Sequence, residues 1–160
     1  MMGAADHQAY LDLLKELGGC LDKLAELSQQ KAETVRQDDL IAMDAVLKQE
    51  QAVGLTVRGL ELRRVKLMGQ LGLENVPLAQ LPEHYPAELF DEAKRTAESL
   101  RQSYKIYRSS ADMARNLLEL NLHQIEKIIT AAGVDPVEAG AGYEIPGAEP
   151  PKNMKTDFRA

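Results

Sequence analysis

Apolar residues recur along most of this chain at alternating spacings of three and four residues, which places them on one face of a helix. The first such stripe consists of Tyr10, Leu14, Leu17, Leu21 and Leu24, and it is widened by Leu13, Cys20 and Leu27. These positions come close to a coiled-coil repeat. The pattern therefore predicts a first amphipathic helix over about residues 7–36.

A second helix is predicted over residues 40–71. Asp39 is a favourable N-cap residue for a helix that begins at Leu40. Gly72 suits the position just after a helix, and Pro77 follows it. The apolar stripe of this helix consists of Val46, Val53, Val57, Leu60, Leu67 and Leu71. No Gly or Pro occurs in residues 36–39, so one continuous helix through residue 70 is an alternative.

The third predicted helix covers residues 86–132 and is the longest, at about 70 Å. Pro86 suits the first position of a helix, where its missing N–H is not needed. The stripe consists of Phe90, Ala93, Ala97, Leu100, Tyr104, Tyr107, Ala111, Ala114, Leu118, Asn121, Ile125, Ile128 and Ala132. Asn121 is its polar member, and it either fixes register with a partner helix or lies partly exposed near the helix end.

Composition supports an all-α fold with a tail. The chain has no Trp, two Phe and five Tyr, whereas β folds draw heavily on aromatic residues. Residues 133–160 are rich in Pro and Gly, which is typical of a linker. We therefore expect a helical domain at 1–132, in which three long helices form an antiparallel coiled-coil-like bundle with a long third helix. Residues 133–160 are expected to form a flexible C-terminal tail.

The predicted helix lengths do not match. A helix over 40–71 spans about 48 Å, and it covers the third helix only to about residue 117. Residues 118–132 would extend about 20 Å further. Apolar residues surround much of this end of the helix: Leu117, Leu118, Leu120, Leu122, Ile125, Ile128 and Ile129. A second copy or a partner segment is expected to cover them. The alternative is that the helix ends differ and the bundle is better matched.

Charge and targeting signals narrow the classes of partner. Acidic residues outnumber basic ones by 25 to 19, and no basic block occurs, which argues against binding to nucleic acid or to an anionic membrane surface. No apolar run is long enough to insert into a membrane. The single cysteine, Cys20, cannot form an internal disulfide, and the N-terminus lacks the pattern of a secretory signal. We therefore expect a cytoplasmic protein.

No pattern indicates catalysis, a cofactor or a metal. His123 and Glu126 have helix-face spacing that resembles half of a di-iron motif, but one such pair is more typical of a solvated helix face. The chain has no phosphate-binding glycine loop and no nucleophile elbow. We interpret it as a non-enzyme without cofactor or metal.

Several short motifs, taken in order, resemble those of the FlgN-type flagellar export chaperones. They are the Leu-rich first helix, Asp-Asp-Leu-Ile-Ala-Met at 38–43, Leu-Pro-Glu at 81–83, the run from Asn116 to Ile125, the tail segment 143–147 and the closing residues 157–160. The chain departs from the family at Asp38, where the family has Gly, and in its last residues, which read Asp-Phe-Arg-Ala rather than Asp-Arg-Lys-Ala. These departures leave open the boundary of the first turn and any role of the extreme C-terminus.

The resemblance implies a cytosolic chaperone of the flagellar type III export apparatus. Such a chaperone binds the C-terminal segments of hook-associated proteins, prevents their premature assembly and delivers them to the export gate. The client-binding residues would be Leu118, Asn121, Leu122, Ile125, Ile128 and Ile129. Tyr143 resembles a gate-docking tyrosine of the family, although an exposed tyrosine in a tail can equally be inert. The competing interpretation is a self-associating coiled-coil scaffold without a client, for which a homodimer is possible.

Overall fold

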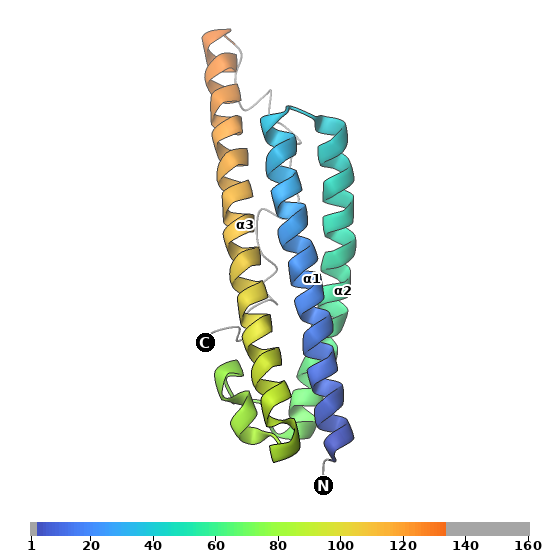
Figure 1. Ribbon diagram of the computed structural model, residues 1–160. Helices are drawn as coiled ribbons and strands as arrows, with labels where there is room; N and C mark the ends of the chain where they lie inside the picture. The colour runs from blue at the N-terminus through green and yellow to red at the C-terminus, as the bar shows by residue number, and fades with distance from the viewer. Residues whose placement is uncertain (1–2, 134–160) are drawn as a thin grey trace.

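The fold is all-α, as the sequence predicts. A computed structural model describes residues 3–133 of the chain (Figure 1). Three long helices account for most of these residues: α1 (Ala4–Arg36), α2 (Leu40–Leu71) and α3 (Phe90–Ala131). Two short 3₁₀ helices, η1 (Leu78–His84) and η2 (Ala87–Leu89), connect α2 to α3.

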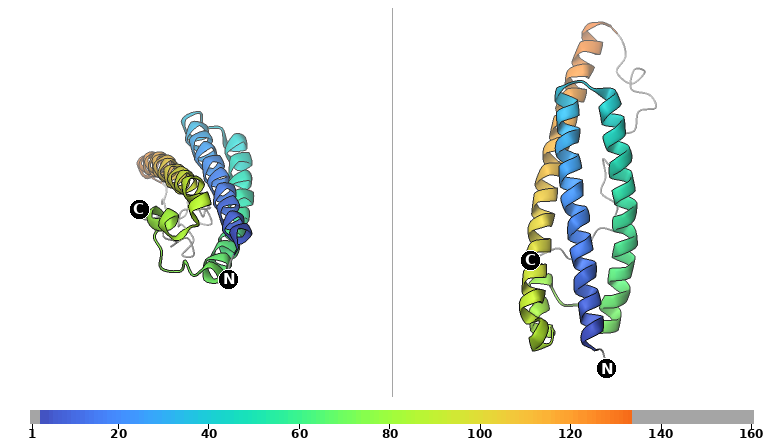
Figure 2. Two further views of the ribbon diagram at one scale, coloured as in Figure 1. Left: turned by 60° about the horizontal axis from the view of Figure 1, so that its bottom comes forward. Right: turned by 45° about the vertical axis from the view of Figure 1, so that its right-hand side comes forward.

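Helix α1 lies in the middle of the molecule, and both α2 and α3 pack on it (Figures 1 and 2). Because α2 reverses the chain direction, α1 and α3 run parallel. Lys15 of α1 binds Glu92 near the start of α3 at 2.7 Å, and Gln29, in the last third of α1, lies 3.5 Å from Ser110 of α3. This register brings the end of α1 level with about residue 118 of α3, so the long helix continues past its support.

The two ends of α2 lie where the sequence places them. The Asp39 carboxylate accepts a hydrogen bond of 3.0 Å from the Ala42 backbone N–H, which satisfies one of the open donors of the first turn. Gly72 has a φ of 68°, the left-handed conformation that closes many helices. Asp38 has a φ of 52° in the turn between α1 and α2. The residue in the family's glycine position thus adopts a conformation that glycine favours.

The start of α3 differs from the expectation. Pro86 does not open the long helix but precedes η2, and α3 begins four residues later at Phe90. Phe90 is 42% exposed and does not take part in the buried stripe, contrary to the predicted pattern. The residues that α3 buries are Ala93, Thr96, Ala97, Leu100, Ser103, Ser110 and Ala114. Most of these are small, so α1 and α3 can approach closely.

The connection between α2 and α3 closes the lower end of the bundle. Leu73, Leu81 and Tyr85 are buried there, and η1 packs on α3. The Tyr85 hydroxyl donates a hydrogen bond of 2.8 Å to the backbone oxygen of His7. The two rings meet edge to face with centroids 4.7 Å apart. Burial raises the pKa of Tyr85, so the hydroxyl stays protonated and can donate to that carbonyl.

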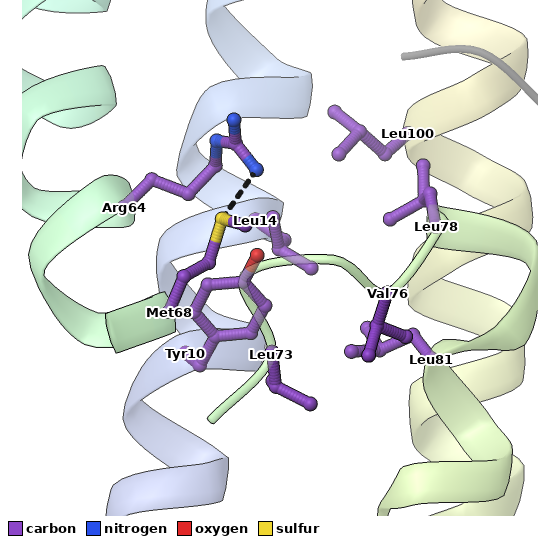
Figure 3. A pocket seen from close by; sticks show the side chains of 9 residues that line it. All are labelled: Tyr10, Leu14, Arg64, Met68, Leu73, Val76, Leu78, Leu81 and Leu100. Atoms are coloured by element: carbon purple, nitrogen blue, oxygen red, sulfur yellow. Dashed lines mark hydrogen bonds between the residues drawn. The ribbon is translucent and has the colours of Figure 1, made fainter. Parts of the chain in front are cut away.

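A buried polar group lies beside a small cavity at this end of the bundle (Figure 3). Arg64 of α2 forms an ion pair of 2.7 Å with Glu61, and both side chains are almost fully enclosed. The guanidinium also lies 3.0 Å from the Met68 sulfur. Burial raises the pKa of Tyr10, and the positive charge of Arg64 partly offsets this rise. The cavity holds about 20 Å³, room for little more than one water molecule.

Candidate functional site

The far end of α3 extends beyond the rest of the bundle. We call residues 118–131 the overhang. Figures 1 and 2 show it passing the turn that joins α1 to α2. Ala114 is the last residue of α3 that is fully buried, which marks where support from α1 ends. The overhang is about 20 Å long, as the predicted lengths of the helices indicated.

The overhang keeps helical geometry because its sequence favours it. No Gly or Pro occurs between residues 90 and 131, and Leu, Ala, Glu and Arg are frequent. Near the end, the Thr130 hydroxyl donates a hydrogen bond of 2.8 Å to the backbone oxygen of Glu126. Gly133, with a φ of 82°, follows the last turn. Local sequence preferences thus favour the helix here, although the rest of the bundle no longer buries its apolar side chains fully.

The structure brings the six predicted client-binding residues onto one face of α3, the continuation of the face that packs on α1 below. Leu118, Asn121, Leu122 and Ile129 are half-buried. Ile125 is 43% exposed and Ile128 is 69% exposed, while Leu120, which is 60% exposed, lies on the other side of the helix next to Lys127. An apolar strip of this kind on a helix is typical of a surface that another chain covers.

The opposite face of the overhang is polar. Glu119, His123, Glu126 and Lys127 are all exposed there. They give this end of the helix a solvated side and leave one face for a partner. Among residues 3–133, no three His, Cys, Asp or Glu side chains group as a metal site would require. Within the same part of the chain, no helix is both long and apolar enough to cross a membrane.

Sequence reasoning missed a second exposed apolar surface. Leu55 and Leu62 on the outer side of α2 are 66% and 70% exposed. Their spacing of seven residues, with Gly59 between them and Ala52 three residues before Leu55, was the signal for a second stripe. Tyr143, the predicted gate-docking residue, lies outside the described residues.

The geometry of the overhang suits the binding of another helix. Leu118, Leu122, Ile125 and Ile129 follow the spacing by which an amphipathic helix meets an apolar surface. Ile125 and Ile128 still expose much of their side chains, so a partner would remove that surface from water. The arrangement offers binding energy without any reactive group.

Comparison with known proteins identifies the family. The model of the FlgN protein family matches residues 1–150, which is nearly the whole chain. Neither a curated protein nor a solved structure gives a significant match. Proteins of this family are cytoplasmic, non-catalytic chaperones of flagellar export whose clients are the hook-associated proteins. The extent of the match shows that this chain belongs to the FlgN family and is a flagellar export chaperone for hook-associated proteins.

Proposed function

We propose that the overhang is the surface on which this chaperone binds the C-terminal segment of a hook-associated protein. The contact residues are Leu118, Asn121, Leu122, Ile125, Ile128 and Ile129. The observation that carries this proposal is the continuation of one apolar face past the last buried residue, Ala114. The chaperone holds the client in the cytoplasm and keeps it from assembling before export.

The binding energy available from this face is adequate for a client contact. Full burial of a Leu or Ile side chain contributes about 1.5–3 kcal/mol. Ile125 and Ile128 begin substantially exposed, and the half-buried Leu118, Leu122 and Ile129 add part of that value each. Ordering a disordered client segment costs about 2–5 kcal/mol of the gross energy. The binding free energy that remains after this cost corresponds to a reversible complex, which suits a chaperone that must release its client.

A second copy of the chain is the competing occupant of the overhang. Two copies present the same apolar strip, so a homodimer through this face and a client complex exclude each other. On our proposal the client displaces any such dimer, and light scattering of a mixture reports one chaperone for each client segment. A dimer that persists in the presence of saturating client would instead support the scaffold interpretation.

Delivery to the export apparatus is assigned to a different part of the chain. We place gate docking at Tyr143, which follows Ile129 by 14 positions in the sequence and lies outside the described residues. Separate sites let the chaperone present a bound client at the gate. Replacement of Tyr143 by Ala is expected to lower export of the hook-associated protein while its affinity for the chaperone stays unchanged.

Calorimetric titration with the C-terminal segment of a hook-associated protein tests the client site. The double variant Ile125→Asp/Ile128→Asp places two charges on the proposed contact face, and its affinity should fall at least about thirtyfold. Lys127→Asp introduces the same residue in the same turn on the exposed opposite face and should retain affinity within about threefold. Circular dichroism checks that all proteins keep their helix content. Equal affinity of the double variant and the parent would refute the assignment.

A further inference from the structure

Helix α2 carries a second apolar stripe on the side turned away from α1. We call it the outer stripe, and it consists of Ile41, Ala45, Ala52, Leu55, Gly59 and Leu62. These residues are spaced by three, four or seven positions, so they share one helix face. All six are exposed, and the large members Ile41, Leu55 and Leu62 are 87%, 66% and 70% exposed.

The two faces of α2 have different packing. Met43, Val46, Val57 and Leu60 form its buried face against α1. The outer stripe instead alternates large side chains with Ala and Gly, a pattern that lets another helix approach closely with its own large side chains over the small positions. A side chain built at Gly59 would meet nothing within 4 Å, so the space over this position is open.

Basic residues frame the central part of the outer stripe. Lys48 and Lys66 lie on the stripe, one on each side of the segment from Ala52 to Leu62, and Arg58 and Arg63 flank that segment on its two sides. All four are exposed. Within the described residues no ion pair engages Arg58, Arg63 or Lys66, while Lys48 pairs with Asp44 at 2.9 Å.

The acidic residues of the same segment are turned away from this surface. Glu50 binds Lys31 of α1 at 3.0 Å, and Glu61 binds Arg64 at 2.7 Å. All four of these side chains are mostly buried. The exposed charge between residues 48 and 66 is therefore entirely positive, in a chain whose net charge is −6.

We propose that the outer stripe docks an amphipathic helix of a partner protein whose apolar face is bordered by Asp and Glu. The four basic residues complement such a border, and the alternation of large and small positions accepts a closely packed helix. A second copy of this chain fits poorly. An antiparallel copy centred between Leu55 and Gly59 would set Lys48 opposite the other copy's Lys66, and a parallel copy would set each cation against its equivalent.

This docking surface is distinct from the overhang. The two lie on different helices, and α2 and α3 make little contact with each other. A chaperone with both surfaces can hold a client at one and a further helical protein at the other.

Two synthetic helical peptides test the proposal with the full-length protein. They share one apolar stripe of Leu and Ala, and one carries Glu at the flanking positions whereas the other carries Lys. By fluorescence anisotropy, the Glu peptide should bind at least about tenfold tighter than the Lys peptide at low salt, and added salt should narrow the difference. Arg58→Glu/Arg63→Glu should reverse the preference, and Leu55→Asp should abolish binding of the Glu peptide.

Controls separate this surface from the client site. Ile125→Asp/Ile128→Asp should leave binding of the Glu peptide unchanged, and Leu55→Asp should leave binding of the hook-associated segment unchanged. Circular dichroism verifies that each variant is folded. Equal affinity for the two peptides, or retention of the Glu peptide by Leu55→Asp, overturns the proposal. It also fails if sedimentation shows a dimer of the parent protein that Leu55→Asp dissociates, since a second copy would then occupy the stripe.

Discussion

The two halves of α3 have the same secondary structure and different surroundings. From Phe90 to Ala114 the helix packs on α1 and buries small residues such as Ala93, Ala97 and Ser103. From residue 118 to residue 131 it runs alone and presents Leu and Ile on the continuation of the same face. One half has close packing with few large side chains, and the other has large side chains that are half-buried or exposed.

This difference shows how one helix can serve two purposes. Small residues let α1 and α3 approach closely, so the lower half is stabilised by tight packing. The large aliphatic residues of the overhang contribute little to the stability of the bundle, because nothing in residues 3–133 covers them fully. They suit a surface that must capture a disordered segment. The change from small to large side chains marks the boundary between the fold and the site.

The largest difference between the two halves of α3 is expected in the loss of stability on substitution by alanine. Leu100 is 2% exposed and lies beside Gly18 of α1, so Leu100→Ala should lower the free energy of unfolding by about 3 kcal/mol. Ile128 is 69% exposed, and Ile128→Ala should change the free energy of unfolding by less than about 0.5 kcal/mol. Urea denaturation measures both values. Similar losses for the two variants would mean that the overhang is part of the folding core.

Substitutions at Gly18 should show how tightly the lower half is packed. A Cβ atom at this position would lie 3.8 Å from Leu100 Cδ1 and 4.0 Å from Ser103 Oγ, which is ordinary contact. Gly18→Ala should therefore stabilise the protein by about 0.5–1 kcal/mol through helix propensity. Gly18→Leu should overfill the interface and cost about 1–3 kcal/mol. If thermal unfolding shows that both variants are stabilised, α1 and α3 are less closely packed than described.

Acid should weaken the start of α3 through Glu92. Hydrogen bonds from Gln8 and from Lys15 lower the pKa of this carboxyl group. The resulting stabilisation is present above the pKa of an unfolded glutamate and is lost as the pH falls through the lower folded value. The stability difference between the parent and Glu92→Gln should therefore shrink as the pH falls from 7 to 3. Urea titrations across this range measure it, and a difference that is constant or grows in acid would contradict the assignment.

Much of this organisation is encoded in local sequence signals. Asp39 and Gly72 specify the ends of α2 through capping and a left-handed turn, and both act within a few residues. The overhang followed from comparing helix lengths, because a helix has a fixed rise for each residue. These features need no knowledge of long-range packing.

Other features depend on contacts that a hydrophobic pattern does not contain. The pattern placed Phe90 and Tyr104 on the contact stripe of α3, but the structure buries Thr96 and Ser103 more fully. Small polar residues allow close approach of two helices, and a search for apolar residues overlooks them. The outer stripe of α2 was missed for a similar reason, since Ala and Gly separate its large members. The start of α3 was predicted four residues too early, because Pro86 precedes the 3₁₀ helix η2 and not the long helix itself.

Hydrogen exchange of the full-length protein, alone and with the C-terminal segment of a hook-associated protein, tests the central claim most directly. Amides from Ala93 to Ala114 should exchange slowly in both samples, because this half of α3 is packed in the bundle. Amides of residues 118–131 should exchange quickly in the protein alone and become strongly protected when the client segment is added. Fast exchange of the overhang that the client leaves unchanged, with protection appearing elsewhere, would contradict the account.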